Sequence, residues 1–218
     1  MRIYIVRHGE SYMNIKSGAN SEEDLPLTEK GIKQSEALRD YFQDIMFDHI
    51  FSSPMLRAKQ TTEIICGEER SFEIYDALHE ISLGKLGNMT WQQRQKLYPG
   101  VDLSAALSKV NSPDGESFEK VLRRCNDFIK NKLELRGMGE NILVVCHGVV
   151  KRVLINSLLE KPSHYVDYIN WADNTAVTEI DWKNKKLLKL NDRKHLTDTG
   201  LSNPEKWINF SERDYTQL

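Results

Sequence analysis

Hydrophobic and polar positions follow two alternating periods along the chain. Short β-branched or continuously apolar runs, typical of buried strands, alternate with stretches whose apolar residues recur every three or four positions, as on one face of a helix. Strands are predicted over residues 1–6, 48–52, 72–75, 141–146, 175–181 and 186–191. Helices are predicted from residue 28, from 54 to about 66, and over 90–98, 117–135 and 149–159. This alternation predicts an α/β fold with a mainly parallel central sheet flanked by helices on both faces.

Local signals sharpen several of these boundaries. Thr28 is expected to cap the helix that it opens, and Pro54 suits the first turn of the next one. A glycine-rich loop is expected over residues 84–88, and the Pro-Gly pair at 99–100 should end the helix before it. The last two strands are expected to form a hairpin that turns at Asn184.

The length of 218 residues suits one domain, and we expect a single domain over residues 1–218. Residues 196–218 are expected to form a C-terminal extension of it. That segment is polar but carries three aromatic residues, Trp207, Phe210 and Tyr215, so we expect something to hold it in place.

Composition and charge exclude several classes of protein. With 39% apolar and 28% charged residues and a net charge of −2, the chain has no global attraction for nucleic acid or an anionic membrane. No apolar run approaches the roughly 20 residues that span a bilayer, and the first residues do not resemble a signal peptide. The three cysteines, Cys66, Cys125 and Cys146, are odd in number and widely spaced, which argues against a disulfide framework and favours a reducing, cytoplasmic setting.

One local design occurs twice. An apolar strand runs into a His-Gly pair at His8-Gly9 and again at His147-Gly148. Ligands of open α/β sheets bind at the carboxyl ends of the strands, where both pairs are expected. Each glycine would let the backbone approach a ligand closely or adopt a positive φ. A lone histidine most often caps a strand, but two matched turns favour a site.

Two arginines give this site its predicted chemistry. Arg7 precedes His8, and Arg57 lies near the start of a helix that follows a strand. A guanidinium grips phosphate oxygens through paired hydrogen bonds, and a helix start favours an anion. Arg57 alone would most often be a surface residue, but together with two histidines it predicts a pocket for a phosphate group.

Catalysis in such a pocket needs a nucleophile and a proton donor. A histidine can attack phosphorus and form a covalent phosphoenzyme, and phosphoryl transfer depends mainly on positioning and charge stabilisation. The leaving alkoxide then needs a proton, which a carboxylic acid at the mouth of the pocket can supply. Glu80, after the third predicted strand, is the best candidate, although an isolated glutamate is usually solvated.

These residues resemble the histidine phosphatase superfamily, the phosphoglycerate mutase-like proteins, in its phosphatase branch. The resemblance runs from residue 1 to about 195 in the family's order. The segments that carry it are residues 7–11 with Asn14, 25–31 with Gln34 and Ala37, 52–58 with Gln60 and Thr61, 78–80, 114–117, 145–148 and 173–175.

The resemblance implies a role for each matching position. It makes His8 the phosphorylated nucleophile and Glu80 the proton donor, on a phosphoglycerate mutase-like fold. No metal or cofactor is implied. The implied phosphate pocket consists of Arg7, Asn14, Arg57, His147 and the backbone N–H of Gly148.

Departures from the family pattern bear on the substrate. Residues 80–84 lack the Arg and Tyr that follow the acid in the mutases, and the mutases' later paired arginines are not evident. We therefore expect a phosphomonoester hydrolase that acts on a small phosphorylated metabolite, with 2,3-bisphosphoglycerate-dependent phosphoglycerate mutase as the alternative. Residues 84–90 keep only the first Gly and the Thr of a common phosphatase motif, so the resemblance names no substrate. Positions that could set specificity are Lys85, Trp91, Arg94 and Tyr98.

Two other classes of function fit less well. A catalytically inactive relative used as a binding module would be expected to have lost His8 or Arg57, and both are present. A metal enzyme with His8 and His147 as ligands would need further ligands in a recognisable spacing, and the flanking arginines would repel a divalent cation. The sequence carries no signal for the oligomeric state.

Overall fold

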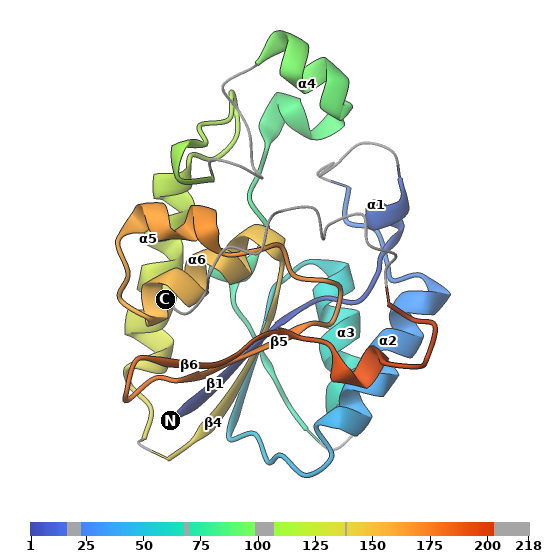
Figure 1. Cartoon of the computed structure of the whole chain (residues 1–218), viewed down its shortest axis with the longest axis vertical. Helices are drawn as coiled ribbons and strands as arrows, with labels where there is room; N and C mark the ends of the chain where they lie inside the picture. The colour runs from blue at the N-terminus through green and yellow to red at the C-terminus, as the bar shows by residue number, and fades with distance from the viewer. Residues whose placement is uncertain (17–22, 68–69, 99–106, 138, 203–218) are drawn as a thin grey trace.

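A six-stranded sheet runs through the middle of the molecule (Figure 1). The computed structural model describes residues 1–16, 23–67, 70–98, 107–137 and 139–202. Across the sheet the strands lie in the order β3-β2-β4-β1-β5-β6. Their bounds are β1 Arg2–Arg7, β2 His49–Ser52, β3 Glu73–Ile74, β4 Asn141–Cys146, β5 Val177–Asp181 and β6 Lys186–Asp192. The first four strands in that order pair in parallel, and β5 and β6 add an antiparallel edge.

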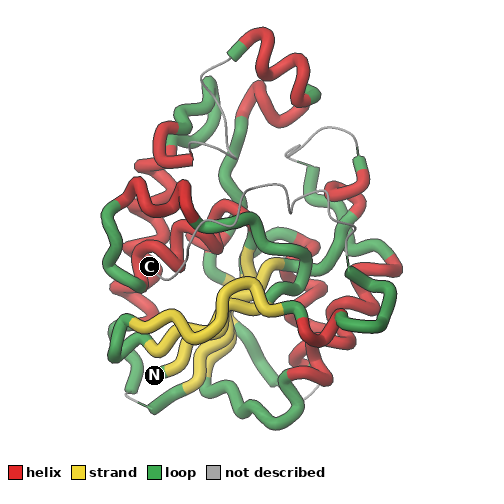
Figure 2. Tube along the Cα trace, in the orientation of Figure 1, coloured by secondary structure: helices red, strands yellow, loops and turns green. Residues whose placement is uncertain are grey.

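Helices cover both faces of the sheet (Figure 2). The α-helices are α1 Tyr12–Ile15, α2 Glu29–Tyr41, α3 Leu56–Cys66, α4 Trp91–Leu97, α5 Phe118–Phe128 and α6 Gly148–Leu158. Short helical turns are η1 Asp76–Leu78, η2 Gly84–Asn88, η3 Leu107–Lys109, η4 Ile129–Leu133, η5 Ser163–Tyr168 and η6 Lys194–Leu196. The α/β fold predicted from the sequence is confirmed.

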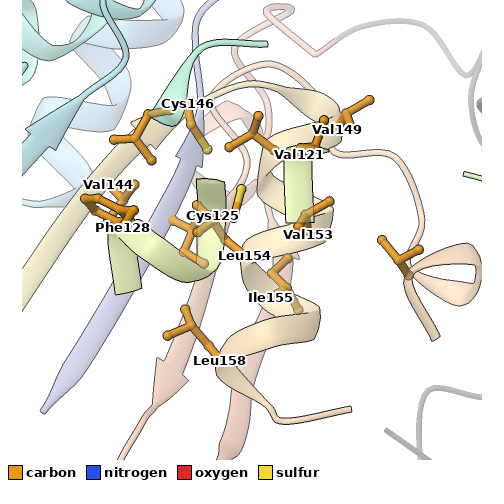
Figure 3. Close-up of a cluster of buried hydrophobic side chains, with 14 of the residues drawn as sticks. Val121, Cys125, Phe128, Val144, Cys146, Val149, Val153, Leu154, Ile155 and Leu158 are labelled. Atoms are coloured by element: carbon orange, nitrogen blue, oxygen red, sulfur yellow. The ribbon is translucent and has the colours of Figure 1, made fainter. Parts of the chain in front are cut away.

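The side chains of the central strands alternate between two hydrophobic clusters. On β4, Val144 and Cys146 pack against α5 and α6 (Figure 3), whereas Leu143 and Val145 pack in the second cluster with α2 and α3. A strand turns successive side chains to opposite faces, so a strand between two helical layers must be apolar at every position. This requirement explains the continuous apolar run that precedes each His-Gly pair.

Several helix boundaries differ from the prediction. Pro54 lies ahead of α3, which is capped at Met55, and the expected loop at 84–88 is the 3-10 helix η2. The expected helix over 117–135 is α5 followed by the π-helical turn η4, in which Ile129 and Leu133 are buried.

Other local expectations are confirmed. Thr28 caps α2, with its side chain accepting a hydrogen bond from the Gly31 N–H, and Asn184 lies in the turn between β5 and β6. Leu196 is buried, so the described start of the C-terminal extension is held against the domain. The Pro-Gly pair at 99–100 and the aromatic residues of the extension, Trp207, Phe210 and Tyr215, lie outside the described residues.

All three cysteines are free, in agreement with the prediction of no disulfide framework, and all three are buried. Burial disfavours the thiolate and raises the pKa of Cys66 to about 11 and that of Cys125 to about 12. Cys146, the last residue of β4, packs in the larger hydrophobic cluster. Within the described ranges, no helix combines the length and the apolar character needed to cross a membrane.

Candidate active site

The two His-Gly pairs lie side by side at the carboxyl ends of neighbouring parallel strands. Arg7, the last residue of β1, is in register with Cys146, the last residue of β4, so the residue that follows each strand meets its counterpart. The ring centroids of His8 and His147 are 5.1 Å apart, and both side chains are buried. The sheet register therefore builds the pair that the repeated sequence pattern predicts.

The ring of His8 is fixed in one tautomer. Its Nδ1 lies 2.7 Å from the Gly9 carbonyl oxygen, which can only accept, so Nδ1 carries the proton and donates. Nε2 consequently holds the lone pair, and it accepts a hydrogen bond from Arg57 Nε at 3.2 Å. Burial, followed by the positive charges of Arg57 and Arg7, holds the pKa of His8 well below its usual 6.5. At neutral pH the ring is neutral, with an available nitrogen lone pair.

The ring of His147 is held by its other nitrogen. Its Nε2 lies 2.7 Å from Ser53 Oγ, and that oxygen also accepts a weak hydrogen bond from the Met55 N–H at 3.3 Å. The serine hydroxyl can donate its proton to Nε2, and in that arrangement the ring proton of His147 lies on Nδ1. That Nδ1 is buried and has no hydrogen-bond partner among the described residues. Burial and then the charge of Arg57 hold the pKa of His147 well below 6.5.

Each of the two arginines uses some of its guanidinium nitrogens in contacts within the protein and leaves another without a hydrogen-bond partner. Arg7 Nη1 donates to the Ala172 carbonyl oxygen at 2.6 Å, and Arg57 Nη1 lies 3.7 Å from an Asp24 carboxylate oxygen. Arg7 Nε and Arg57 Nη1 nevertheless lack hydrogen-bond partners within the described part of the chain. Buried donors of this kind are rare without a reason. Nδ1 of His147 also lacks a hydrogen-bond partner, and the charges of Arg57 and Arg7 both act on His8. Such a set of groups suits an anion.

The Glu80 carboxylate lies beside the His147-Gly148 turn. Its Oε1 accepts from the Ile81 N–H at 3.0 Å, and its Oε2 accepts from the Val149 N–H, in the first turn of α6, at 3.2 Å. Glu80 also acts electrostatically on both Arg7 and Arg57, opposing the fall in their pKa that burial causes. The structure thus places Glu80, the predicted acid, close to Arg7, His8, Arg57 and His147. These five residues are called the catalytic cluster below, or the cluster for short.

A sequence model described as "Histidine phosphatase superfamily (branch 1)" matches residues 3–193. The chain belongs to the histidine phosphatase superfamily. Relatives include the "Probable phosphoglycerate mutase GpmB" of Salmonella arizonae, 27% identical over 205 residues that cover 86% of this chain and 88% of that protein. The 6-phosphofructo-2-kinase/fructose-2,6-bisphosphatase of Gallus gallus is 32% identical over 80% of this chain but only 36% of its own length. The crystal structure of the alpha-ribazole phosphatase from Shigella flexneri has a TM-score of 0.77 and 25% identity, covering 88% of this chain and 96% of that one.

Asn14 of this histidine phosphatase lies at the exposed edge of the cluster. Its Oδ1 accepts hydrogen bonds from the Ser11 N–H at 2.9 Å and from Asn174 Nδ2 at 3.2 Å. With the amide oxygen engaged in this way, Nδ2 is the group of Asn14 that can turn to a ligand.

Of the two roles expected for these glycines, a close approach to a ligand or a positive φ, the second is not observed. Neither has a positive φ. A Cβ on Gly9 would lie 2.6 Å from the Gly31 carbonyl oxygen in α2, and a Cβ on Gly148 would lie 2.4 Å from the Trp171 ring. Both approaches are far shorter than a real Cβ contact. Each glycine therefore lets another element of the protein close on the turn.

The positions considered for specificity have different surroundings. Lys85 is exposed and pairs with Asp114 at 2.5 Å. Arg94 is buried and its Nε donates to the Leu86 carbonyl oxygen, so this guanidinium is used within the protein. Tyr98 is partly buried against the core, and the Trp91 side chain lies outside the described part of the structure. In the described ranges, no group of three or more His, Cys, Asp or Glu side chains could hold a metal ion.

The structure also reveals supporting residues that sequence reasoning did not single out. Thr61 accepts from the Gly9 N–H at 2.9 Å, and Asn174 Nδ2 donates to the His8 carbonyl oxygen at 2.9 Å. Both lie in segments that carry the family resemblance, so the signal was present without a role attached to it. Their partners are distant in sequence, and only the assembled fold shows them.

The segment around Glu80 has its own support. Arg124 donates from Nη1 to the Ala77 carbonyl oxygen at 2.5 Å, and Glu116 accepts from the Ser82 N–H at 3.0 Å. Arg124 and Glu116 are joined by an ion pair of 2.9 Å between Nε and Oε1. This half-buried pair ties together the two ends of the segment that carries Glu80.

Proposed function

We propose that this protein hydrolyses phosphate monoesters of small metabolites through a phosphohistidine at Nε2 of His8. The observation that carries the proposal is the state of His8, a neutral buried histidine whose Nδ1 is occupied and whose Nε2 lone pair faces a guanidinium. The buried nitrogens of Arg7, Arg57 and His147 that lack hydrogen-bond partners support the binding of a phosphate group.

Substrate binding would free the nucleophile. Arg57 Nε donates to the neutral Nε2 of His8, but a charged phosphate oxygen is a much stronger acceptor. An incoming phosphate therefore draws the guanidinium to itself and leaves the lone pair facing phosphorus. Arg7, Arg57 and His147 Nδ1 then bind the oxygens on which charge is spread. Asn14 Nδ2 and the Gly148 N–H, at the start of α6, add neutral donors.

In the first chemical step the His8 Nε2–P bond forms while the bond between phosphorus and the ester oxygen breaks. Glu80 enters this step as the neutral carboxylic acid, gives its proton to the leaving oxygen and becomes a carboxylate. The phosphorylated ring is positively charged, and the Gly9 carbonyl oxygen, which accepts from Nδ1, stabilises that charge. In the second step water attacks phosphorus, Glu80 takes a proton from it, and the N–P bond breaks. The step releases phosphate and restores neutral His8.

The segment that follows Glu80 favours hydrolysis over the mutase alternative. A mutase must retain its substrate by a second anion clamp while the phosphoryl group changes position. Ile81 and Leu83 are buried in the core, and the Ser82 N–H donates to Glu116. This segment therefore offers no cationic group to a substrate carboxylate. We infer that the phosphoenzyme reacts with water.

The proposal is tested by phosphate release from an aryl phosphate at mildly acidic to neutral pH in the presence of a chelator. Metal-independent turnover is expected because the proposed steps use only His, Arg and Glu side chains. Activity that is lost in chelator and restored by a divalent cation would contradict this mechanism.

The mutase alternative has its own test. Incubation with 3-phosphoglycerate and catalytic 2,3-bisphosphoglycerate should yield little 2-phosphoglycerate. Interconversion that outpaces hydrolysis by roughly tenfold, about 1.4 kcal/mol in barrier, would favour the mutase.

A screen of phosphorylated metabolites would identify the ester. It should include sugar phosphates, phosphoserine, 3-phosphoglycerate, nucleotides and, because a solved relative bears that name, α-ribazole phosphate. The three free and buried thiols support a reducing, cytoplasmic setting for this reaction.

A further inference from the structure

The segment that follows β6 is linked by hydrogen bonds to both ends of residues 7–10, the loop that carries His8. Residues 194–202, which we call the brace, begin with η6 and continue alongside α2, as Figure 1 shows for the red part of the chain. The family match ends at residue 193, so the brace lies just beyond it. The catalytic loop is residues 7–10, which carry Arg7 and the proposed nucleophile His8.

One arm of the brace reaches the loop through Thr175. His195 Nε2 lies 2.9 Å from Thr175 Oγ1, whose own proton is donated to the Asn174 carbonyl oxygen at 2.7 Å. The histidine is therefore the donor. The Thr175 N–H in turn donates to the Arg7 carbonyl oxygen at 2.9 Å, with a longer contact of 3.3 Å to that of His8.

Thr175 needs such support because of its backbone. Its φ is +59°, a conformation that a β-branched residue rarely adopts and that persists only where the surroundings enforce it. The hydrogen bond from His195 is one of those enforcing contacts. Burial lowers the pKa of His195 to about 4, so the ring stays neutral and keeps a single donor on Nε2.

A second arm reaches the other end of the loop through Gln34. This side chain is fully buried, and its Oε1 accepts from the Glu10 N–H at 2.8 Å. Its Nε2 donates to the Leu201 carbonyl oxygen, also at 2.8 Å. Because one amide group makes both bonds, the position of Leu201 sets the orientation of the acceptor that holds Glu10.

The brace has a defined conformation of its own. Leu196 is buried, and its carbonyl oxygen accepts from Thr199 Oγ1 at 2.8 Å. The Leu201 N–H donates to the same Thr199 hydroxyl at 3.1 Å. Lys30, in α2, donates to the Ser202 carbonyl oxygen at 3.3 Å. Both arms thus start from one ordered segment.

We propose that residues 194–202 position the catalytic loop, with His195 and Gln34 as positioning residues that act on His8 from its two sides. Neither residue touches the proposed phosphate pocket. The inference rests on the proposed function only in what the loop does, because the placement of the His8 ring can be measured without a substrate.

The test compares His195→Leu, which removes the donor to Thr175, with His195→Gln, whose amide can still donate. The readout is the single-turnover rate at which His8 becomes phosphorylated by an aryl phosphate, corrected for the folded fraction. We expect about a tenfold loss in His195→Leu and a rate within about threefold of wild type in His195→Gln. His164→Leu, at an exposed histidine on η5, is the matched control and should keep the wild-type rate.

A second variant tests the other arm if His195→Leu does not fold. Gln34→Glu keeps an acceptor for the Glu10 N–H but loses the donor to Leu201, and it should slow phosphorylation in the same way. Equal rates in wild type, His195→Leu and Gln34→Glu, with only the unfolding midpoint lowered, would overturn the proposal and leave the brace a purely stabilising element.

A substrate-free readout separates this inference from the proposed function. The His8 Nδ1 proton, hydrogen-bonded to the Gly9 carbonyl oxygen, should exchange with water faster in His195→Leu than in wild type or His195→Gln, as measured by NMR. Faster exchange in a protein whose wild type forms no phosphohistidine would support the brace and reject the proposed function. Unchanged exchange with normal wild-type catalysis would reject the brace alone.

Discussion

The two His-Gly turns look alike in sequence, but the fold uses them differently. His8 has its Nδ1 hydrogen-bonded to the Gly9 carbonyl oxygen, which leaves the Nε2 lone pair available. His147 has its Nε2 hydrogen-bonded to Ser53, which leaves Nδ1 without a partner and, when the serine donates, makes Nδ1 the donor of the ring. One ring thus offers an electron pair and the other a proton. The comparison teaches that the group hydrogen-bonded to one ring nitrogen, not the sequence motif, decides what the other nitrogen of each histidine can do.

The largest expected effect comes from removing the nucleophile. His8→Ala should lower turnover by about 10⁴-fold or more, since no other side chain in the cluster offers a comparable lone pair to phosphorus. His147→Ala removes one donor to the phosphate and should cost only about 10²- to 10³-fold. Steady-state rates on one aryl phosphate decide the matter. Equal losses of turnover in the two variants would contradict the assignment of His8 as nucleophile and His147 as a donor to the phosphate.

Glu80→Gln should produce a smaller loss that depends on the substrate. An amide keeps the size of the side chain but cannot donate a proton as a carboxylic acid does, so alkyl phosphates should slow by about 10²-fold. Activated aryl phosphates, whose leaving groups need little protonation, should slow much less. The check is the slope of log rate against leaving-group pKa for both proteins. Parallel slopes would remove Glu80 from the role of acid.

Ser53→Ala should have a milder effect that reports directly on His147. Without the serine proton at Nε2, the ring loses its tautomer preference, and turnover should fall by about tenfold. Ser52→Ala is a matched control, because Ser52 is an equally buried serine whose hydroxyl donates to the Ser53 carbonyl oxygen instead of a histidine ring. The ¹⁵N shifts of His147 should change in Ser53→Ala only. A normal tautomer there would show that another group orients the ring.

The smallest expected effect is on stability. Burial lowers the pKa of His8 and His147 well below 6.5 and that of His195 to about 4. Between those values and 6.5 the unfolded chain binds protons that the folded chain does not, so the free energy of unfolding rises with pH in this window. The urea midpoint should therefore be lower at pH 5 than at pH 7.

Variants at two histidines check this pH dependence. His195→Gln should reduce the change of the urea midpoint between pH 7 and pH 5, because one buried histidine that binds a proton only on unfolding has been removed. His164→Gln, at an exposed histidine, should leave it unchanged. A midpoint that does not fall between pH 7 and pH 5 would contradict the neutral state assigned to these histidines.

The sequence predicts the fold well where a single physical rule applies. Strands buried on both faces must be apolar throughout, and β4 is predicted with its observed bounds, Asn141–Cys146. Boundaries that depend on competing contacts are predicted less well. The change from α5 to the wider turn η4 is not signalled by helical periodicity, because the buried Ile129 and Leu133 would share one face of a continuous α-helix as well.

The five residues of the catalytic cluster could likewise be predicted more easily than the residues that orient them. Arg7, His8, Arg57, Glu80 and His147 could be predicted because their residue types and places at strand ends point to phosphate chemistry. The residues that orient these side chains could not be predicted, because they are distant in sequence. Ser53, for example, lies 94 positions before His147, with which it forms a hydrogen bond. The link from His195 through Thr175 to the loop likewise exists only once β5 pairs with β1. Such contacts follow from register and packing, not from a local pattern.

The assignment of chemistry to one nitrogen of one histidine is tested most directly by trapping the phosphoenzyme. The protein is mixed with an aryl phosphate, quenched in alkali to preserve a phosphorus–nitrogen bond, and analysed by peptide mapping and ³¹P NMR. We predict a single phosphoryl group, on His8 and on Nε2. Phosphate on His147, on Nδ1 of His8, or on neither histidine during turnover would contradict the mechanism.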